Sequence, residues 1–315
     1  MILITGGMGF IALHVAAELA GHDDVVLTYH RTRREHGDVE KLVGAPVAME
    51  QVNVENPYSL ARAVARHRPD SIVHMAVPGL GALEPAEEIA SAMTGLVNVL
   101  EAGRIAGVTR LTIASSVAVY WGLERGPYRE DEPLPVGSAS ATSAMKKAAE
   151  VLALHYADRT GLNVALLRIG MVYGPLYHTL ANVPSRLLHY AVKGRPLETE
   201  RGQWDMGRLR VGLDLCYVKD CADAVARIHR AERMRHRIYN VSGGRTIPVS
   251  EILDAVTAAV PGVSFPAALR EPAGEQRQAA HMDISRVSEE FGYIPRFPVA
   301  EGIGDYARWL HDHDL

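Results

Sequence analysis

The stretch ILITGGMGFIA at residues 2–12 decides the fold that this chain is expected to adopt. Three apolar residues lead into Gly6, Gly9 and Ala12, which are spaced three residues apart and are followed by a helical pattern of apolar positions. A strand, a glycine turn and a helix in this order hold the pyrophosphate of a dinucleotide. Gly6 permits the tight turn, Gly9 lets the backbone approach the phosphates, and the helix N-terminus offers free N–H groups. Ala12 replaces a third glycine and is small enough for close packing.

The rest of the chain alternates between strand-like and helix-like segments. Short apolar runs predict strands at 2–5, 25–29, 47–49, 71–75, 110–114, 163–168, 215–218 and 238–241. Amphipathic stretches predict helices at 10–20, 57–67, 86–106, 142–159, 220–232, 249–259 and 298–311. This alternation is typical of an α/β fold, a doubly wound parallel sheet of the Rossmann type. We expect a dinucleotide-binding domain at 1–170, to which segments of the C-terminal half return, and a smaller α/β substrate lobe at 171–315.

Composition argues against several classes of function. A net charge of −4 and a pI of about 6.4 do not favour binding to nucleic acid or to an anionic membrane surface. No apolar run reaches the roughly 18 residues of a membrane span, and the chain begins on a core strand, so we expect no signal peptide. Cys216 and Cys221 lie in an apolar segment and are interpreted as buried thiols of a cytoplasmic protein. The histidines have no metal-ligand spacing, so no metal is expected.

Six segments share the order and spacing of one protein family. They are ITGGMGFIA at 4–12, PDSIVHMA at 69–76, NVLEAGRIAGVTRLTIASSVAVY at 98–120, LLRIGMVYGP at 166–175, YVKDCADAV at 217–225 and YNVSGGRTIPVSEI at 239–252. In these segments the chain resembles the extended short-chain dehydrogenases/reductases, which include nucleotide-sugar epimerases and dehydratases. The resemblance implies a bound nicotinamide dinucleotide, a small-molecule substrate and a homodimer formed through the helices at 86–106 and 142–159.

The residues after the second predicted strand bear on the choice between NAD and NADP. NAD-binding members have an acidic residue there for the ribose hydroxyls, whereas this chain reads VVLTYHRTRR at 25–34. Arg31 lies at this point, and a guanidinium suits a 2′-phosphate through paired hydrogen bonds. We therefore expect NADP, with NAD as the alternative if Arg31, Arg33 and Arg34 form a solvated loop. The resemblance implies further cofactor contacts from Phe10, Ile11, Asn53, Val54, Met75, Ala76, Val77 and Lys146.

The catalytic set of the family is only partly present. Its Ser or Thr corresponds to Ser116 in SSVAVY. Its Tyr-x-x-x-Lys pair, usually with a Glu four residues after the Lys, identifies Lys146, because Glu150 follows at that spacing. The position of the tyrosine is then Thr142, one helical turn before Lys146 and on the same face.

The alternative register, which pairs Ser143 with Lys147, also lacks a tyrosine. The absence matters because a phenol can be brought to ionise near neutral pH, whereas an aliphatic hydroxyl cannot. Thr142 is therefore expected to orient a substrate or to relay a proton through water, not to replace the phenol as a general base.

Other residues are candidates for moving the proton or for binding substrate. Lys146 itself is one. The others are Tyr120, Tyr128, Tyr173 and His178, although Tyr120 and Tyr173 match residues usual in the family, so packing explains them equally well. The arginine that commonly meets the nucleotide diphosphate is replaced by Leu213, and Arg208 and Arg210 are near enough in sequence to substitute.

Three functions remain open on these residues. The first is an NADP-dependent oxidoreductase or epimerase that acts on a hydroxyl or keto group of a sugar derivative or another small polyol. The second is a non-redox isomerase or lyase on the same scaffold, and the third is a protein that keeps the cofactor and has lost catalysis. A 4,6-dehydratase is disfavoured, because Val117 and Ala118 follow Ser116 where dehydratases of the family have Asp-Glu.

Overall fold

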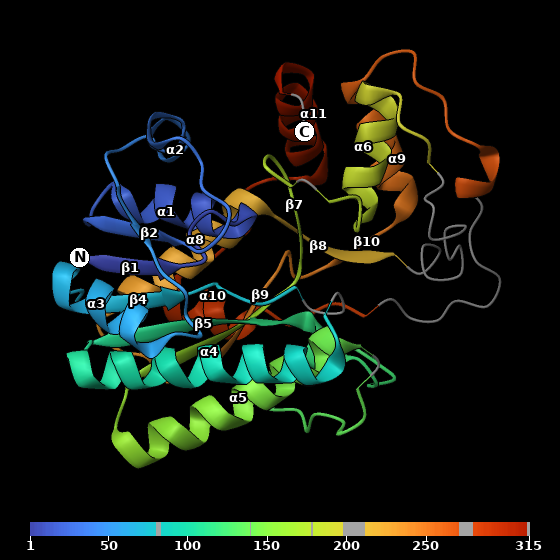
Figure 1. The fold of residues 1–315 in the computed structure, drawn as a ribbon. Coiled ribbons are helices and arrows are strands. Elements are labelled where there is room, and N and C mark those ends of the chain that lie inside the picture. The colour runs from blue at the N-terminus through green and yellow to red at the C-terminus, as the bar shows by residue number, and fades with distance from the viewer. Residues whose placement is uncertain (80–82, 139, 178, 198–211, 271–279, 314–315) are drawn as a thin grey trace.

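A seven-stranded parallel sheet forms the centre of the computed structural model, which describes residues 1–79, 83–138, 140–177, 179–197, 212–270 and 280–313. The strand order is β3-β2-β1-β4-β5-β6-β9, with every pair parallel (Figure 1). The strands are β1 (Ile2–Thr5), β2 (Val25–Tyr29), β3 (Ala48–Gln51), β4 (Ser71–His74), β5 (Arg110–Ser116), β6 (Val164–Ile169) and β9 (Ile238–Val241). Because all seven run in the same direction, their carboxyl ends meet at one edge of the sheet.

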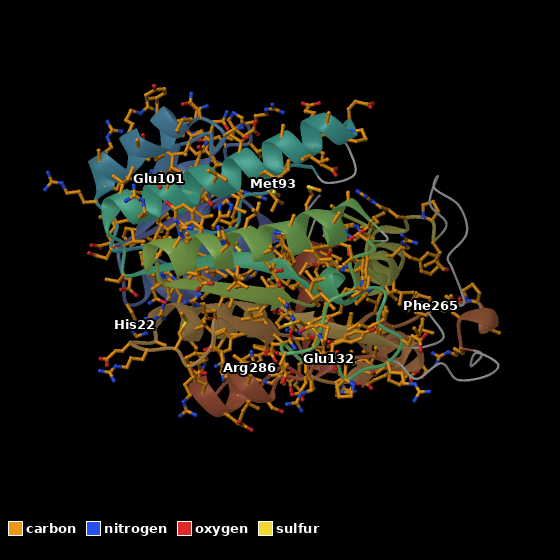
Figure 2. All side chains as sticks on the ribbon, turned by 90° about the horizontal axis from the view of Figure 1, so that it is seen from below. His22, Met93, Glu101, Glu132, Phe265 and Arg286 are labelled. Atoms are coloured by element: carbon orange, nitrogen blue, oxygen red, sulfur yellow. The ribbon has the colours of Figure 1, made fainter. Side chains whose placement is uncertain are left out.

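The two faces of the sheet carry separate apolar cores, as strand geometry requires. Ile2 and Ile4 pack with one cluster, whereas Leu3 between them packs with the other. The first face is covered by α1 (Phe10–Ala20), α2 (His36–Val43), α8 (Val218–Arg230) and α10 (Ser285–Phe291). The second face is covered by α3 (Pro57–His67), α4 (Pro85–Ala106) and α5 (Ala141–Thr160). Figure 2 shows α4 and α5 side by side.

A smaller set of elements follows β6. The strands β7 (Met171–Tyr173), β8 (Leu213–Tyr217) and β10 (Thr246–Ile247) form a second sheet in the order β10-β8-β7. The helices α6 (Val183–Lys193), α9 (Val249–Ala259) and α11 (Val299–Asp312) pack on one another beside it (Figure 1). Short 3₁₀ turns occur as η1 (Val117–Tyr120) and η2 (Ala267–Leu269). Between these elements the chain returns to the large sheet through α8 and β9.

The predicted fold class is confirmed, and every predicted strand and helix is present, some with the predicted ends and the others with ends shifted by one or two residues. The sequence patterns missed the short elements α2, α10, β7 and β10, and also α6, which is as long as α1. In α2, for example, only Val39 and Val43 are buried, which is too few to produce a clear helical period. Among the described residues, no helix combines the length and apolar character needed to cross a bilayer.

Candidate active site

The glycine turn between β1 and α1 lies at the carboxyl edge of the large sheet. Gly6 has a φ of +69°, and a Cβ there would lie 2.7 Å from the backbone nitrogen of Ala76, just beyond the end of β4. Gly9 is exposed and donates its N–H to the Gly6 carbonyl at 2.9 Å. No side chain caps α1, and its first turn holds no acidic residue. The turn therefore requires glycine and leaves the helix start free for an anion, which fits a dinucleotide pyrophosphate.

The turn also lies where the order of the strands reverses, with β1 between β2 and β4. Ligands of open α/β sheets bind at this point. Below it, the Thr5 hydroxyl and His74 Nδ1 share a hydrogen bond of 2.7 Å, and Met75 donates its N–H to the Thr5 carbonyl at 3.1 Å. Burial, with the Lys146 ammonium as second cause, lowers the pKa of His74 to about 3. A neutral histidine therefore joins β1 to β4 under the turn.

Three arginines, Arg31, Arg33 and Arg34, follow β2 at the carboxyl edge of the sheet. Arg31 is exposed and forms no ion pair within the described part of the chain. The Arg33 guanidinium lies over the Tyr29 ring, 5.9 Å from its centroid. Arg34 Nε is buried without a hydrogen-bond partner among the described residues. No carboxylate follows β2 before Glu35, so the positive charge here is not neutralised within the segment.

Asn53 and Val54 follow β3 at the same edge. The side-chain oxygen of Asn53 accepts from the Glu55 N–H at 3.0 Å, which closes a local turn. The Val54 carbonyl accepts from Asn98 Nδ2 at 2.9 Å, and its side chain packs on Gly95, where a Cβ would come within 3.1 Å. Val54 therefore connects the strand end to α4. Val77, on the far side of the turn, is 54% exposed.

Lys146 reaches from α5 to the large sheet. Its Nζ donates to the Ala114 carbonyl of β5 at 2.6 Å. Lys147 Nζ instead donates to the Pro135 and Gly137 carbonyls of the loop before α5, at 2.6 and 2.7 Å. The register that pairs Thr142 with Lys146 is therefore the one at the sheet. Burial lowers the pKa of Lys146 to about 8, and the opposing influence of Glu150 is smaller.

Glu150 and Arg168 form a buried ion pair between α5 and β6. Arg168 Nη2 lies 2.8 Å from Glu150 Oε2, with the two side chains 3% and 4% exposed. The Ser115 hydroxyl donates to Glu150 Oε1, and Arg168 Nη1 donates to the Tyr120 hydroxyl at 2.8 Å. These contacts fix the turn of α5 that follows Lys146. Sequence reasoning used Glu150 only to set the register and missed Arg168, although a charged residue inside the apolar run LLRI was the available signal.

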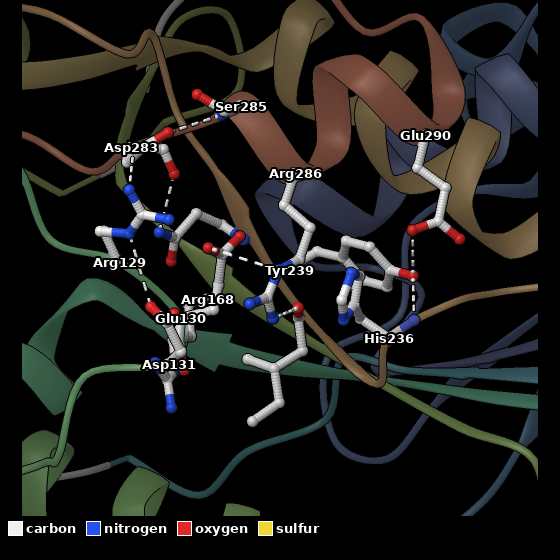
Figure 3. Close-up of polar contacts among 12 residues, drawn as sticks. Arg129, Glu130, Asp131, Arg168, His236, Tyr239, Asp283, Ser285, Arg286 and Glu290 are labelled. Atoms are coloured by element: carbon white, nitrogen blue, oxygen red, sulfur yellow. Dashed lines mark hydrogen bonds and ion pairs between the residues drawn. The ribbon is translucent and has the colours of Figure 1, made fainter.

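The ion pair is tied to the C-terminal half of the chain through Asn240 and Glu130. The Tyr120 hydroxyl donates to Asn240 Oδ1 at 2.8 Å, and the Asn240 N–H donates to Glu130 Oε1 at 2.9 Å. Figure 3 shows Glu130 near Arg168, which donates to its carbonyl at 3.3 Å, and near Arg286, whose Nε lies 3.7 Å from its carboxylate. Residues from β6, β9 and α10 therefore hold the loop that follows β5.

Ser116 and Thr142 lie beside these anchored residues. Ser116 ends β5, two residues beyond the carbonyl that binds Lys146, and its Oγ accepts from the Ala118 N–H at 3.1 Å. Thr142 lies in the first turn of α5 and is half-buried. Its hydroxyl makes no hydrogen bond within the described residues. The structure thus brings Ser116 and Lys146 to the carboxyl end of β5, with Thr142 one helical turn before Lys146.

The substrate candidates occupy different environments. The Tyr128 ring stacks on Tyr120 at 5.0 Å, and burial raises the pKa of its phenol. Tyr173 is 1% exposed, and its hydroxyl packs against Gly302 of α11, where a Cβ would come within 2.5 Å. Tyr173 therefore occupies a core position between β7 and α11. His178, Arg208 and Arg210 lie outside the described residues.

Both cysteines are free and buried, in agreement with the sequence-based interpretation. Three histidines, His74, His189 and His229, are also buried. In the part of the chain that the structure describes, no group of three or more His, Cys, Asp or Glu side chains is arranged to hold a metal ion.

Comparison with known proteins agrees with this geometry. The model of the NAD dependent epimerase/dehydratase family matches residues 2–242. The dTDP-glucose 4,6-dehydratase of Streptomyces griseus is 26% identical over 99% of this chain and 94% of its own length. The UDP-glucose 4-epimerase of Neisseria gonorrhoeae is 26% identical, with 98% and 97% of the two chains covered.

Solved structures of epimerases are similar to this chain over nearly its whole length. The Thermus thermophilus UDP-glucose 4-epimerase, in complex with NAD, is 27% identical with a TM-score of 0.77, and 98% of each chain is covered. The Thermotoga maritima UDP-glucose 4-epimerase, solved with UDP-glucose, has a TM-score of 0.82 at 20% identity, with 99% and 98% covered, and supports the fold alone. This chain belongs to the NAD dependent epimerase/dehydratase family, the extended short-chain dehydrogenases/reductases, and is an NAD(P)-dependent enzyme of the oxidoreductase and epimerase class.

Proposed function

We propose that this enzyme oxidises and reduces a hydroxyl-bearing carbon of a nucleoside-diphosphate sugar, as an epimerase or an oxidoreductase. The observation that carries the proposal is the meeting of two features at one edge of the sheet. The glycine turn lies against Ala76 after β4, and Ser116 and Lys146 lie at the end of the neighbouring strand β5. A nicotinamide dinucleotide held by the turn would supply hydride chemistry there. Ser116 would donate a hydrogen bond to the reacting oxygen.

The same residues argue against a 4,6-elimination. A dehydratase needs an acid and a base near the reacting carbons, and the two residues after Ser116 are Val117 and Ala118 in η1. Neither can exchange a proton. Although one relative is named as a dehydratase, we therefore favour epimerisation or simple oxidation and reduction for this chain.

We favour NADP over NAD, although solved relatives bind NAD. Arg31 is exposed without an ion pair among the described residues, and Arg34 Nε is buried without a partner. A 2′-phosphate would pair with these guanidinium groups.

Isothermal titration should give tighter binding of NADPH than of NADH. A charged hydrogen bond contributes roughly 1.5–3 kcal/mol, so Arg31→Ala should weaken the binding of NADPH by about 10- to 100-fold. Arg233→Ala, in the loop after α8, is the control. Equal loss for both cofactors would contradict an NADP preference.

The substrate is assigned by class. Relatives are named for UDP-glucose, UDP-glucuronate and dTDP-glucose, and the residues beyond 170 are proposed to supply the sugar-binding lobe, with 1–170 as the dinucleotide-binding domain. Tyr128 is the described candidate for a substrate contact. His178, Arg208 and Arg210 keep this role as predictions, and the core position of Tyr173 favours packing.

A homodimer through α4 and α5 is supported by their exposed apolar side chains. Ile89, Val97 and Ile105 on α4 are 50%, 48% and 71% exposed, and Val151 and Leu152 on α5 are 67% and 41% exposed. Figure 2 places Met93 on the same helix as the first three of these residues. Analytical ultracentrifugation should give a dimer that Val97→Glu dissociates, whereas Val136→Glu, at a 98% exposed loop residue, should leave it intact.

The two buried thiols support a cytoplasmic location.

A second function is favoured by one observation, the presence of Thr142 where the family has its tyrosine. This chain would then bind the cofactor without oxidising a substrate, or would use it in a non-redox isomerase or lyase reaction. Mass spectrometry of the ligand that copurifies with the protein, followed by incubation with UDP-glucose, UDP-glucuronate and dTDP-glucose, separates the cases. Conversion of one sugar, read by chromatography and NMR, supports the first function. Retention of the cofactor without any redox conversion supports the second.

A further inference from the structure

Few groups of the protein compete with a substrate for the Lys146 amine. It donates one hydrogen bond, to the Ala114 carbonyl, and no second acceptor binds it within the described residues. On its own helix Glu150 is the nearest acid, but that carboxylate is held by Arg168 of β6 and by the Ser115 hydroxyl. On β4 the facing group is His74, which is neutral and bonded to Thr5.

We propose that Lys146 is the proton carrier of this enzyme, in place of the missing phenol, an inference that rests on the proposed function. In the oxidation step the neutral amine takes the proton of the substrate hydroxyl at Nζ. The C–H and O–H bonds of the substrate would break and a C=O bond would form, and a bound, oxidised nicotinamide dinucleotide would be the acceptor of the hydride. In the reduction step the ammonium returns the proton to the oxygen as the hydride is added back, so atoms and electrons balance over the cycle.

The other candidate groups are chemically weaker. Thr142 has an aliphatic hydroxyl, which has no accessible anion at neutral pH. Burial raises the pKa of Tyr128, which is the wrong direction for a base. Burial lowers the pKa of Lys146 to about 8, in the range in which lysine serves as a general base. Near that pH both forms of the amine are populated, as a reaction that removes and returns one proton requires.

The direction of the pH effect follows from this assignment. The ammonium dominates below about pH 8, so the oxidation step should slow as the pH falls, because less neutral amine is present. The reduction step should respond in the opposite sense. An arginine at 146 keeps a positive charge but does not release a proton at these pH values. Lys146→Arg therefore separates holding a ribose, which a cation can do, from carrying the proton.

Two measurements on the full chain with NADP⁺ bound test the proposal. The first is competitive labelling with acetic anhydride from pH 6 to 11, with fragment ions that distinguish Lys146 from Lys147. We expect the reactivity of Lys146 to reach half its maximum near pH 8, against about 10.4 for an ordinary lysine. The second is the pH profile of kcat for UDP-glucose oxidation. Lys146→Arg should lower kcat by more than about 100-fold with cofactor affinity retained, whereas Lys147→Met should leave kcat unchanged.

The outcomes are separable. A midpoint above about 10 together with turnover of a sugar would overturn the role of Lys146 alone. Full kcat in Lys146→Arg, or loss of kcat in Tyr128→Phe, would do the same. A midpoint near 8 without turnover of UDP-glucose, UDP-glucuronate or dTDP-glucose would overturn the proposed function, and with it the role of Lys146.

Discussion

The glycine turn after β1 and the first turn of α5 lie at the same edge of the sheet, but they are constrained differently. At Gly6 a Cβ would collide with the Ala76 backbone, so the backbone itself dictates the residue. At Thr142 the side chain is half-buried and forms no hydrogen bond within the described residues, so packing dictates little. A residue that serves only chemistry can therefore change while the fold and the cofactor turn stay intact.

The largest effect is expected at the ion pair that anchors α5. Arg168→Met should destabilise the protein by about 3–5 kcal/mol, because it leaves the buried Glu150 carboxylate without its partner. Urea unfolding followed by circular dichroism measures this. The double variant Glu150→Met with Arg168→Met should recover much of the loss, since no buried charge remains. A cost below about 1 kcal/mol for the single variant would show that the pair does not anchor the helix.

The glycine turn should be the next most sensitive point. Gly6→Ala combines a left-handed backbone with a steric collision, and strain of about 1–3 kcal/mol should weaken dinucleotide binding by about 10- to 100-fold. Gly44→Ala is the matched control, because Gly44 has a φ of +77° with nothing within 4 Å of a Cβ. Isothermal titration with NADPH should give unchanged affinity for that control. Equal losses in both variants would mean that backbone strain alone, without contact at the site, explains the result.

Acid should destabilise both edges of the sheet to a similar extent. His74 at the carboxyl edge has its pKa lowered to about 3, and so has His229, which is bonded to Ser71 and Thr112 near the opposite edge. The unfolded histidine has a pKa of about 6.5, so the unfolded state binds more protons below that pH. The stability is fully present above about pH 6.5 and is lost as the pH falls towards 3. At about pH 5 each histidine should cost about 2 kcal/mol.

Urea unfolding at neutral pH and at about pH 5 checks this expectation. His229→Gln, which keeps a hydrogen-bonding side chain but does not titrate, should reduce the difference between the two pH values by about half. An unchanged difference in that variant would assign the acid sensitivity to other groups.

The sequence predicted the elements built on long periodic patterns and the residues fixed by spacing. The parallel sheet, the turn at Gly6 and the choice of Lys146, four residues before Glu150, all follow from regular intervals along the chain. Two features did not follow. The ion pair of Glu150 and Arg168 joins residues 18 apart through tertiary packing. His74 is neutral because it is buried, and one histidine within an apolar strand pattern does not predict that burial.

The chemistry of the site was harder to predict than its position. Lys146 and Lys147 are adjacent, and only the structure shows that the first reaches Ala114 while the second binds the loop at Pro135. The lowered pKa of Lys146 likewise comes from burial between α5 and the sheet. Neither the contact of Lys146 with Ala114 nor its lowered pKa can be predicted from the spacing of the residues.

The roles of residues 142 and 146 in proton transfer are compared directly by measuring kcat of Thr142→Ala and Lys146→Met on the nucleoside-diphosphate sugar that the wild type turns over, with UDP-glucose as the first probe. If the cofactor half is intact and the amine moves the proton, Thr142→Ala should keep kcat within about tenfold, whereas Lys146→Met should lose about 10²- to 10⁴-fold. Loss of the same size in Thr142→Ala would contradict proton transfer by Lys146 alone, because the hydroxyl at 142 would then be part of the proton transfer.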